Sequence, residues 1–106
     1  MKIINLTPHR IHFVDSENEV FLTVESSGIA RVAAKTVRTG RNIAGIPVSE
    51  TVYGDVENLP DPQEGVVYVV SALVAQCCKD RDDVYIPGEQ VRDEDGRVIG
   101  CRSLGR

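Results

Sequence analysis

A run of five β-branched and aromatic residues at positions 66–70 constrains this 106-residue chain more than any other feature. Valines and a tyrosine without a polar break are typical of a strand that is covered on both faces. Residues 66–70 therefore predict the central strand of a sheet. Ser71 follows as the expected N-cap of a helix over residues 72–80, because its hydroxyl can accept from the free amides of a first turn. That helix is apolar on nearly every side, so we expect its own sheet or a partner subunit to bury it.

Shorter segments with strand periodicity predict a sheet around this strand. They are residues 3–7, 11–14, 20–24, 29–33, 50–56, 83–86, 90–92 and 98–102. The first four are expected to form an antiparallel meander that bends at Pro8, and the last two a closing hairpin. The predicted fold class is α+β, a mainly antiparallel twisted β-sheet with one helix (about 72–80) packed on it. Residues 34–48 contain two glycines and a proline, which predicts a long, partly mobile loop or a loose hairpin.

The length and composition predict one domain over residues 1–106. Apolar residues make up 42% and charged residues 26% of the chain, values typical of a globular protein. With no tryptophan and two phenylalanines, the core must be built from smaller aliphatic side chains, which bury less area than aromatic ones. Self-association would add buried surface, and we expect a homo-oligomer.

The cysteines and the apolar runs predict a cytoplasmic protein that does not enter a membrane. Three cysteines, two of them adjacent at 77–78, fit no disulfide framework and are consistent with a reducing compartment. The longest apolar run, residues 66–75, has half of the ~20 residues that cross a bilayer. The first residues turn polar too soon for a secretory signal.

The charge distribution points to one basic segment in an acidic chain. A net charge of −4 disfavours general nucleic-acid binding, which needs a basic face. Between residues 26 and 49 the only charged side chains are Arg31, Lys35, Arg38 and Arg41, so this segment carries +4 and the rest −8. These cations could close over an anionic ligand, since guanidinium groups grip phosphate and carboxylate well. Alternatively, the segment is solvated or meets an acidic patch on a second subunit.

The histidines and cysteines predict neither a metal site nor a cofactor. His12 lies three positions after His9, so in an extended chain their imidazoles point to opposite faces. Cys77 and Cys78 would lie about 100° apart on a helix. Cys101 falls in a predicted strand, where a buried, inert thiol is the usual case. A histidine base beside it would be required for nucleophilic catalysis.

The junction of the central strand and the helix is the best candidate for anion binding. Free amides and the Ser71 hydroxyl could hold an anion there, although an ordinary serine cap explains the same residue. Arg81 follows the helix, where it either bonds the last carbonyls and the adjacent aspartates or faces a ligand pocket. The candidate ligand-binding residues are Thr7, His9, Arg38, Arg41, Ser71, Arg81 and Arg92.

Three segments of the chain are similar in sequence to a known family of proteins. They are the opening Ile-Asn-Leu-Thr-Pro-His at residues 4–9, residues 70–75, and the tail from 81–84 through 98–102. Together they resemble a family of small uncharacterised phage and prophage proteins. The resemblance implies a phage-encoded protein of the host cell cytosol, and it transfers no activity, fold or site residue.

Two functions fit these observations. The first is a small binding protein that holds an anionic, nucleotide-like ligand and, in a phage, sequesters a host immune signal. The second is a ligand-free protein–protein interaction module that acts on a host or phage protein. An enzyme is supported least, because no nucleophile, base and orienting group can be placed together from the sequence.

Overall fold

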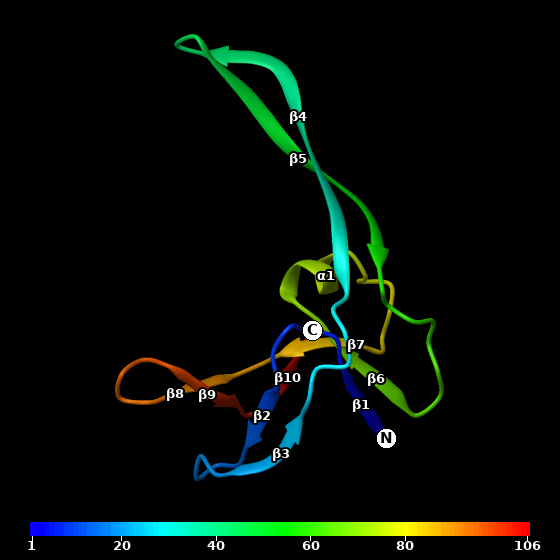
Figure 1. Ribbon diagram of the computed structural model, residues 1–106, viewed down its shortest axis with the longest axis vertical. Helices are drawn as coiled ribbons and strands as arrows, with labels where there is room; N and C mark the ends of the chain where they lie inside the picture. Colours follow the sequence, from blue (N-terminus) through cyan, green and yellow to red (C-terminus); the bar gives the residue numbers. More distant parts are fainter.

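A computed structural model describes residues 1–106 of the protein. At its centre lies strand β6 (Val66–Val69), between two parallel neighbours (Figure 1). These neighbours are β1 (Lys2–Asn5) and β7 (Val84–Pro87). The short strand β10 (Leu104–Gly105) pairs antiparallel with β7 and completes a four-stranded sheet. The prediction of a central strand at residues 66–70 is confirmed.

The side chains of β6 are covered on both faces, as its sequence predicted. Tyr68 and Val70 point to one face, where they pack with Val74 of the helix and Val84 of β7. Val69 points to the other face and packs against the second sheet. All three consecutive residues, Tyr68 to Val70, are 0% exposed.

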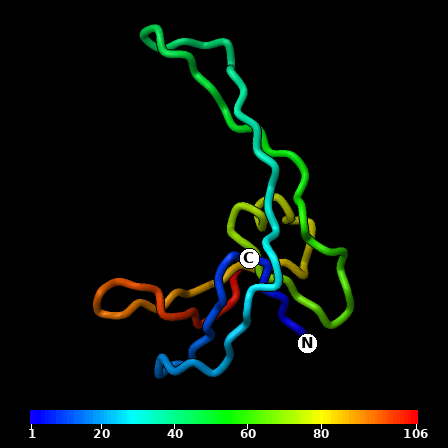
Figure 2. The backbone as a smooth tube through the Cα atoms, in the orientation of Figure 1, coloured from blue at the N-terminus to red at the C-terminus, as the bar shows by residue number.

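A second four-stranded sheet covers the Val69 face. Its strands are β2 (Ile11–Val14), β3 (Val20–Val24), β8 (Gln90–Arg92) and β9 (Val98–Cys101), in the order β3-β2-β9-β8. The β8–β9 pair is the predicted closing hairpin. β2 pairs antiparallel with β3 and parallel with β9, so a segment near the start of the chain lies beside one near its end (Figure 2).

The predicted sheet class is only partly confirmed. Four strand pairs are antiparallel, and three are parallel. Two of the first four predicted strands do not join the expected antiparallel meander. β1 pairs with β6 instead, and residues 29–33 lead into a strand, Arg31–Ile43, that pairs outside this sheet. The continuous apolar pattern of β6 is itself the pattern of parallel strands, which are buried on both faces.

The one helix, α1 (Ala72–Gln76), is shorter than the predicted 72–80. Tighter three-residue turns replace it after Gln76, because the amides of Cys78 and Arg81 donate to carbonyls three residues earlier. Val74 is buried, but Leu73 is 40% exposed, so the body of this chain covers only one side of the helix. With five residues, α1 is too short to cross a membrane.

A two-stranded arm projects from this body (Figure 1). Its strands are β4 (Arg31–Ile43) and β5 (Ile46–Glu57), which pair only with each other. The chain reverses at Ala44 and Gly45, both with positive φ (51° and 83°), as two-residue hairpin turns require. Of the two alternatives for residues 34–48, a loop or a loose hairpin, the structure has a hairpin. Its pairing shifts between Arg38 and Asn42, around Gly40, where φ is 84°.

Candidate functional site

A buried side-chain clamp shapes the turn after β1. Asn5 is 0% exposed, and its Oδ1 accepts from the amide and the hydroxyl of Thr7 at 2.9 and 2.6 Å. Its Nδ2 donates to the carbonyls of His9 and Val24 at 2.7 and 3.1 Å. The Ser26 hydroxyl also donates to the Thr7 carbonyl at 2.6 Å. The opening Asn-Leu-Thr-Pro-His segment thus has a structural role, which is to hold residues 7–9 in one conformation.

A cavity of about 310 Å³ lies beside this turn, and we call it the strand-end pocket. Thr7 follows β1, Ser71 follows β6, and Pro87 ends β7, so the carboxyl ends of all three parallel strands border it. Ligands in open parallel sheets bind at this end of the strands. The remaining wall comes from β2, β9 and their neighbours. The thirteen lining residues are Thr7, His9, Arg10, Ile11, His12, Val70, Ser71, Pro87, Gln90, Val98, Ile99, Gly100 and Cys101.

The lining of the strand-end pocket contains no acidic side chain, although the chain carries a net charge of −4. Arg10 supplies a permanent positive charge, and His9 and His12 supply imidazoles. Arg10 has one ionic contact, to Glu25 at 3.8 Å, and both side chains are mostly exposed. An exposed pair at this distance contributes little energy, so Arg10 is available to an anion in the pocket.

Two polar side chains in the pocket have no partner within the protein. Ser71 stands at the N-cap position of α1, but its hydroxyl makes no capping hydrogen bond, contrary to the role predicted for it. His9 uses only its carbonyl in hydrogen bonds. By contrast, Nδ1 of His12 is bonded to the Thr23 hydroxyl at 2.9 Å. The Thr7 hydroxyl belongs to the Asn5 clamp, so Thr7 forms the wall and Ser71 offers the free hydroxyl.

Cys101 lines the same pocket as an inert thiol. It is 2% exposed, and burial raises the pKa of its thiol despite nearby amides of Gly88 and Ser103. No hydrogen bond joins it to His9 or His12, and the latter is bonded to Thr23. The thiolate, not the thiol, is the nucleophile, so the pocket holds no activated cysteine.

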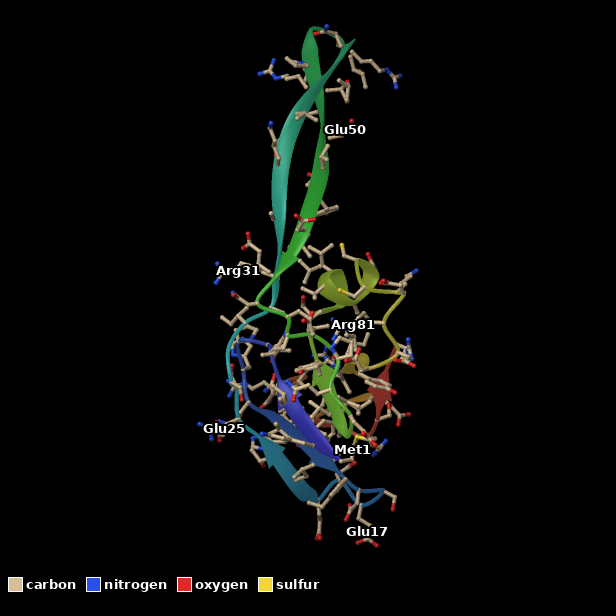
Figure 3. All side chains as sticks on the ribbon, turned by 90° about the vertical axis from the view of Figure 1, so that its right-hand side faces the viewer. Met1, Glu17, Glu25, Arg31, Glu50 and Arg81 are labelled. Atoms are coloured by element: carbon tan, nitrogen blue, oxygen red, sulfur yellow. The ribbon has the colours of Figure 1, made fainter.

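Arg81 is committed to a structural ion pair on another part of the molecule. Its Nε and Nη2 donate to the two carboxylate oxygens of Asp83, each at 2.8 Å, and Nη2 also donates to the Pro60 carbonyl at 3.0 Å. The hydrogen bond from Arg81 lowers the pKa of Asp83. Arg81 lies beside α1, below the arm (Figure 3). It borders a separate cavity of about 280 Å³ with Lys79 and Arg106, but its charge is already paired.

The structure thus brings together three of the seven predicted site residues, Thr7, His9 and Ser71. Arg38 and Arg41 lie on the arm. Arg92 lies at the end of β8, where its Nη1 donates to the Gly96 carbonyl at 2.8 Å. The sequence reasoning missed Arg10 as a lining residue. A signal for it was its position next to His9, after the first proline bend.

The comparisons with known proteins identify no relative. No protein-family model matches the chain, and neither a curated protein nor a solved structure is significantly similar to it.

Proposed function

We propose that this protein binds a small anionic ligand of nucleotide-like chemistry in the strand-end pocket. The observation that carries the proposal is the absence of any acidic side chain from the lining in a chain of net charge −4. Arg10 and His9 would face the charged part of the ligand, and the free hydroxyl of Ser71 would bond it directly.

The apolar part of the lining suits the remainder of such a ligand. Val70, Val98 and Ile99 offer aliphatic surface next to the polar groups, which is the usual composition of a small-molecule site. The volume of about 310 Å³ lies at the lower end of the roughly 300 to 1,000 Å³ that ligand pockets span. A planar base or ring with one anionic group matches this size and mixture.

Binding without turnover is the activity that the chemistry of the pocket favours. The pocket has one thiol, that of Cys101, and burial raises its pKa, which favours the protonated form. Of its two hydroxyls, that of Thr7 belongs to the Asn5 clamp, and that of Ser71 is not hydrogen-bonded to a base that could activate it. In a phage-encoded protein, such a pocket would remove a host nucleotide signal from solution. The alternative, a ligand-free interaction module acting on a host or phage protein, would use the arm instead of the pocket.

A ligand screen tests the proposal. Thermal shift followed by calorimetry would use mononucleotides, cyclic nucleotides, ADP-ribose derivatives and inorganic phosphate. A ligand at a hundred times its Kd stabilises the folded state by about 2.7 kcal/mol. Ser71→Asp should abolish this binding, because it places a negative charge against the anion while aspartate remains a good N-cap residue. Arg10→Ala should weaken binding at least tenfold.

Two control variants change charge at the opposite ends of the same strands. Gln63→Glu adds a negative charge before β6, and Lys2→Ala removes a positive charge at the start of β1. Both should bind as the wild type does. If no compound stabilises the protein, or if Ser71→Asp binds as tightly as Gln63→Glu, the proposal is wrong. Loss of biological function on changing arm residues, with Ser71→Asp fully active, would favour the alternative module.

A further inference from the structure

The chain exposes far more surface than a compact monomer of its size. Its accessible area is 7427 Å², whereas a folded monomer of 11.6 kDa exposes about 5,800 Å². Its radius of gyration is 17.4 Å, against about 13 Å for a compact domain of this length. The excess area of about 1,600 Å² is twice the roughly 800 Å² that each partner buries in a standard interface.

The arm is the part of the chain that no other strand covers. A two-stranded ribbon is marginally stable by itself in water, and both faces of β4 and β5 lack a covering sheet. Near the tip, Ile43 and Ile46 are 64% and 66% exposed. Val52 and Tyr53, midway along β5, are also about half exposed. The arm therefore presents apolar surface that nothing in its own chain buries.

The charges of the arm and the body are complementary. The outer arm, residues 35–52 by its strand pairing, contains Lys35, Arg38 and Arg41 against one acidic residue, Glu50, a net charge of +2. The body, residues 1–30 and 58–106, contains eight Lys and Arg against thirteen Asp and Glu, a net charge of −5. Three of these acids, Asp15, Glu17 and Glu19, lie in the turn between β2 and β3.

This acidic turn lies at the far end of the molecule from the arm tip. Figure 3 shows Glu17 at the bottom of the body and nitrogen-bearing side chains at the outer end of the arm. The adjoining residues of the edge strand β3 are apolar and exposed, with Val20 at 52% and Phe21 at 68%. The arm tip and the β2–β3 hairpin thus both expose apolar residues beside charged ones, and their net charges have opposite signs.

We infer that two copies of this chain form an antiparallel, two-fold dimer in which each arm lies along the body of the other copy. Twelve to thirteen residues per strand at about 3.3 Å each make the arm about 40 Å long. The arm runs along the longest axis of the molecule, 54 Å, so two overlapping antiparallel copies bring each arm alongside the body of the other. In an antiparallel pair, the basic tip of one arm reaches the Asp15–Glu19 turn of the other copy. The two-fold axis repeats the contact, as isologous dimers require.

The same observations favour a second copy over a nucleic acid. A basic β-ribbon can enter a groove of DNA, but three cations on the outer arm would bring a body of net charge −5 to the phosphates. The exposed isoleucines at the arm tip could also pack against the exposed Val20 and Phe21 of a second copy. A phosphate backbone offers no such apolar surface. Opposite charge on one and the same chain is what a self-complementary contact needs.

Complementary charge reversal tests the inference. Size-exclusion chromatography with light scattering should show wild type as a dimer, and Arg38→Glu/Arg41→Glu and Glu17→Arg/Glu19→Arg each as a monomer. Within either variant both contacts pair like charges, but in a mixture of the two variants both contacts become attractive again. The mixture should therefore restore a heterodimer, which native mass spectrometry distinguishes by mass. Lys2→Glu/Lys79→Glu, a reversal of equal size away from both surfaces, should remain a dimer.

Several results would overturn the inference. A wild type that is monomeric at 100 μM, or a dimer that neither reversal disturbs, contradicts it. So does failure of the mixture to dimerise when circular dichroism shows both variants to be folded. If the monomeric wild type binds a 20-base-pair duplex and Arg38→Glu/Arg41→Glu abolishes that binding, the arm serves a nucleic acid and the dimer is wrong.

Discussion

At the scale of single residues, Asn5 organises more of the site than any charged side chain. Its two side-chain atoms make four hydrogen bonds, to groups of Thr7, His9 and Val24. These bonds fix the turn that forms one wall of the strand-end pocket. A buried amide of this kind is costly to truncate, because its former partners then lack hydrogen bonds.

Asn5→Ala should therefore lower the free energy of unfolding by about 2 to 4 kcal/mol, since each buried group left unpaired costs roughly 1 to 3 kcal/mol. Urea denaturation followed by circular dichroism measures the change. Asn42→Ala is the matched control, because Asn42 is exposed on β4 and its side chain makes no hydrogen bond. Equal effects of the two substitutions would contradict the proposed clamp.

At the scale of elements, the Arg81–Asp83 pair holds the connection between α1 and β7 against the loop of residues 58–65, where Arg81 donates to the Pro60 carbonyl. The two side chains are 19% and 12% exposed, so water screens the pair less than a surface pair. Arg81 also lies over the ring of Tyr68 at 5.9 Å. The connection is thus anchored to the central strand and to the loop that precedes it.

The Arg81–Asp83 ion pair makes the stability of the protein depend on pH. The hydrogen bond from Arg81 lowers the pKa of Asp83 in the folded state. The ion pair therefore contributes fully to the free energy of unfolding above the pKa of an aspartate in the unfolded chain, about 3.9. It is lost as pH falls through the lower, folded pKa. Asp83→Asn should thus be less stable than the wild type at pH 7, and this difference should shrink below about pH 4. Thermal melts at pH 7, 5 and 3 measure it. A difference that stays constant over this range would contradict the role of the ion pair.

The elements differ in how far the sequence predicts them. Residues 66–70 carry a local pattern strong enough to identify the central strand, but the pairing of β1 with β6 joins residues about sixty positions apart. No local pattern encodes such a partner. Gly40, Gly45 and Pro47 obscure the strand pattern of the β4–β5 hairpin. Its turn also contains Ala44 with a positive φ, which alanine rarely adopts. Ser71 is predicted as a site residue from its place between the central strand and the helix, where free amides could hold an anion. For Arg81 the sequence allows either a bond to the adjacent aspartates or a place in a ligand pocket, and the structure shows the pairing with Asp83.

At the scale of the whole molecule, the pocket and the arm are separate surfaces. The strand-end pocket lies within the body, between the two four-stranded sheets, and the arm extends along the longest axis of 54 Å. A ligand site and a dimer contact can therefore fail independently. Ser71→Asp should leave the dimer intact, and reversal of the arm charges should leave the pocket residues in place.

A ¹H–¹⁵N NMR titration of the labelled protein with the tightest-binding nucleotide from the screen tests most directly whether the strand-end pocket is the binding site. We expect the largest amide shifts on His9, Ser71 and Gly100, which line the strand-end pocket from three separate segments. Ser71→Asp should remove these shifts. Shifts centred on Lys79 and Arg106, at the other cavity, or on the arm would contradict binding in the strand-end pocket.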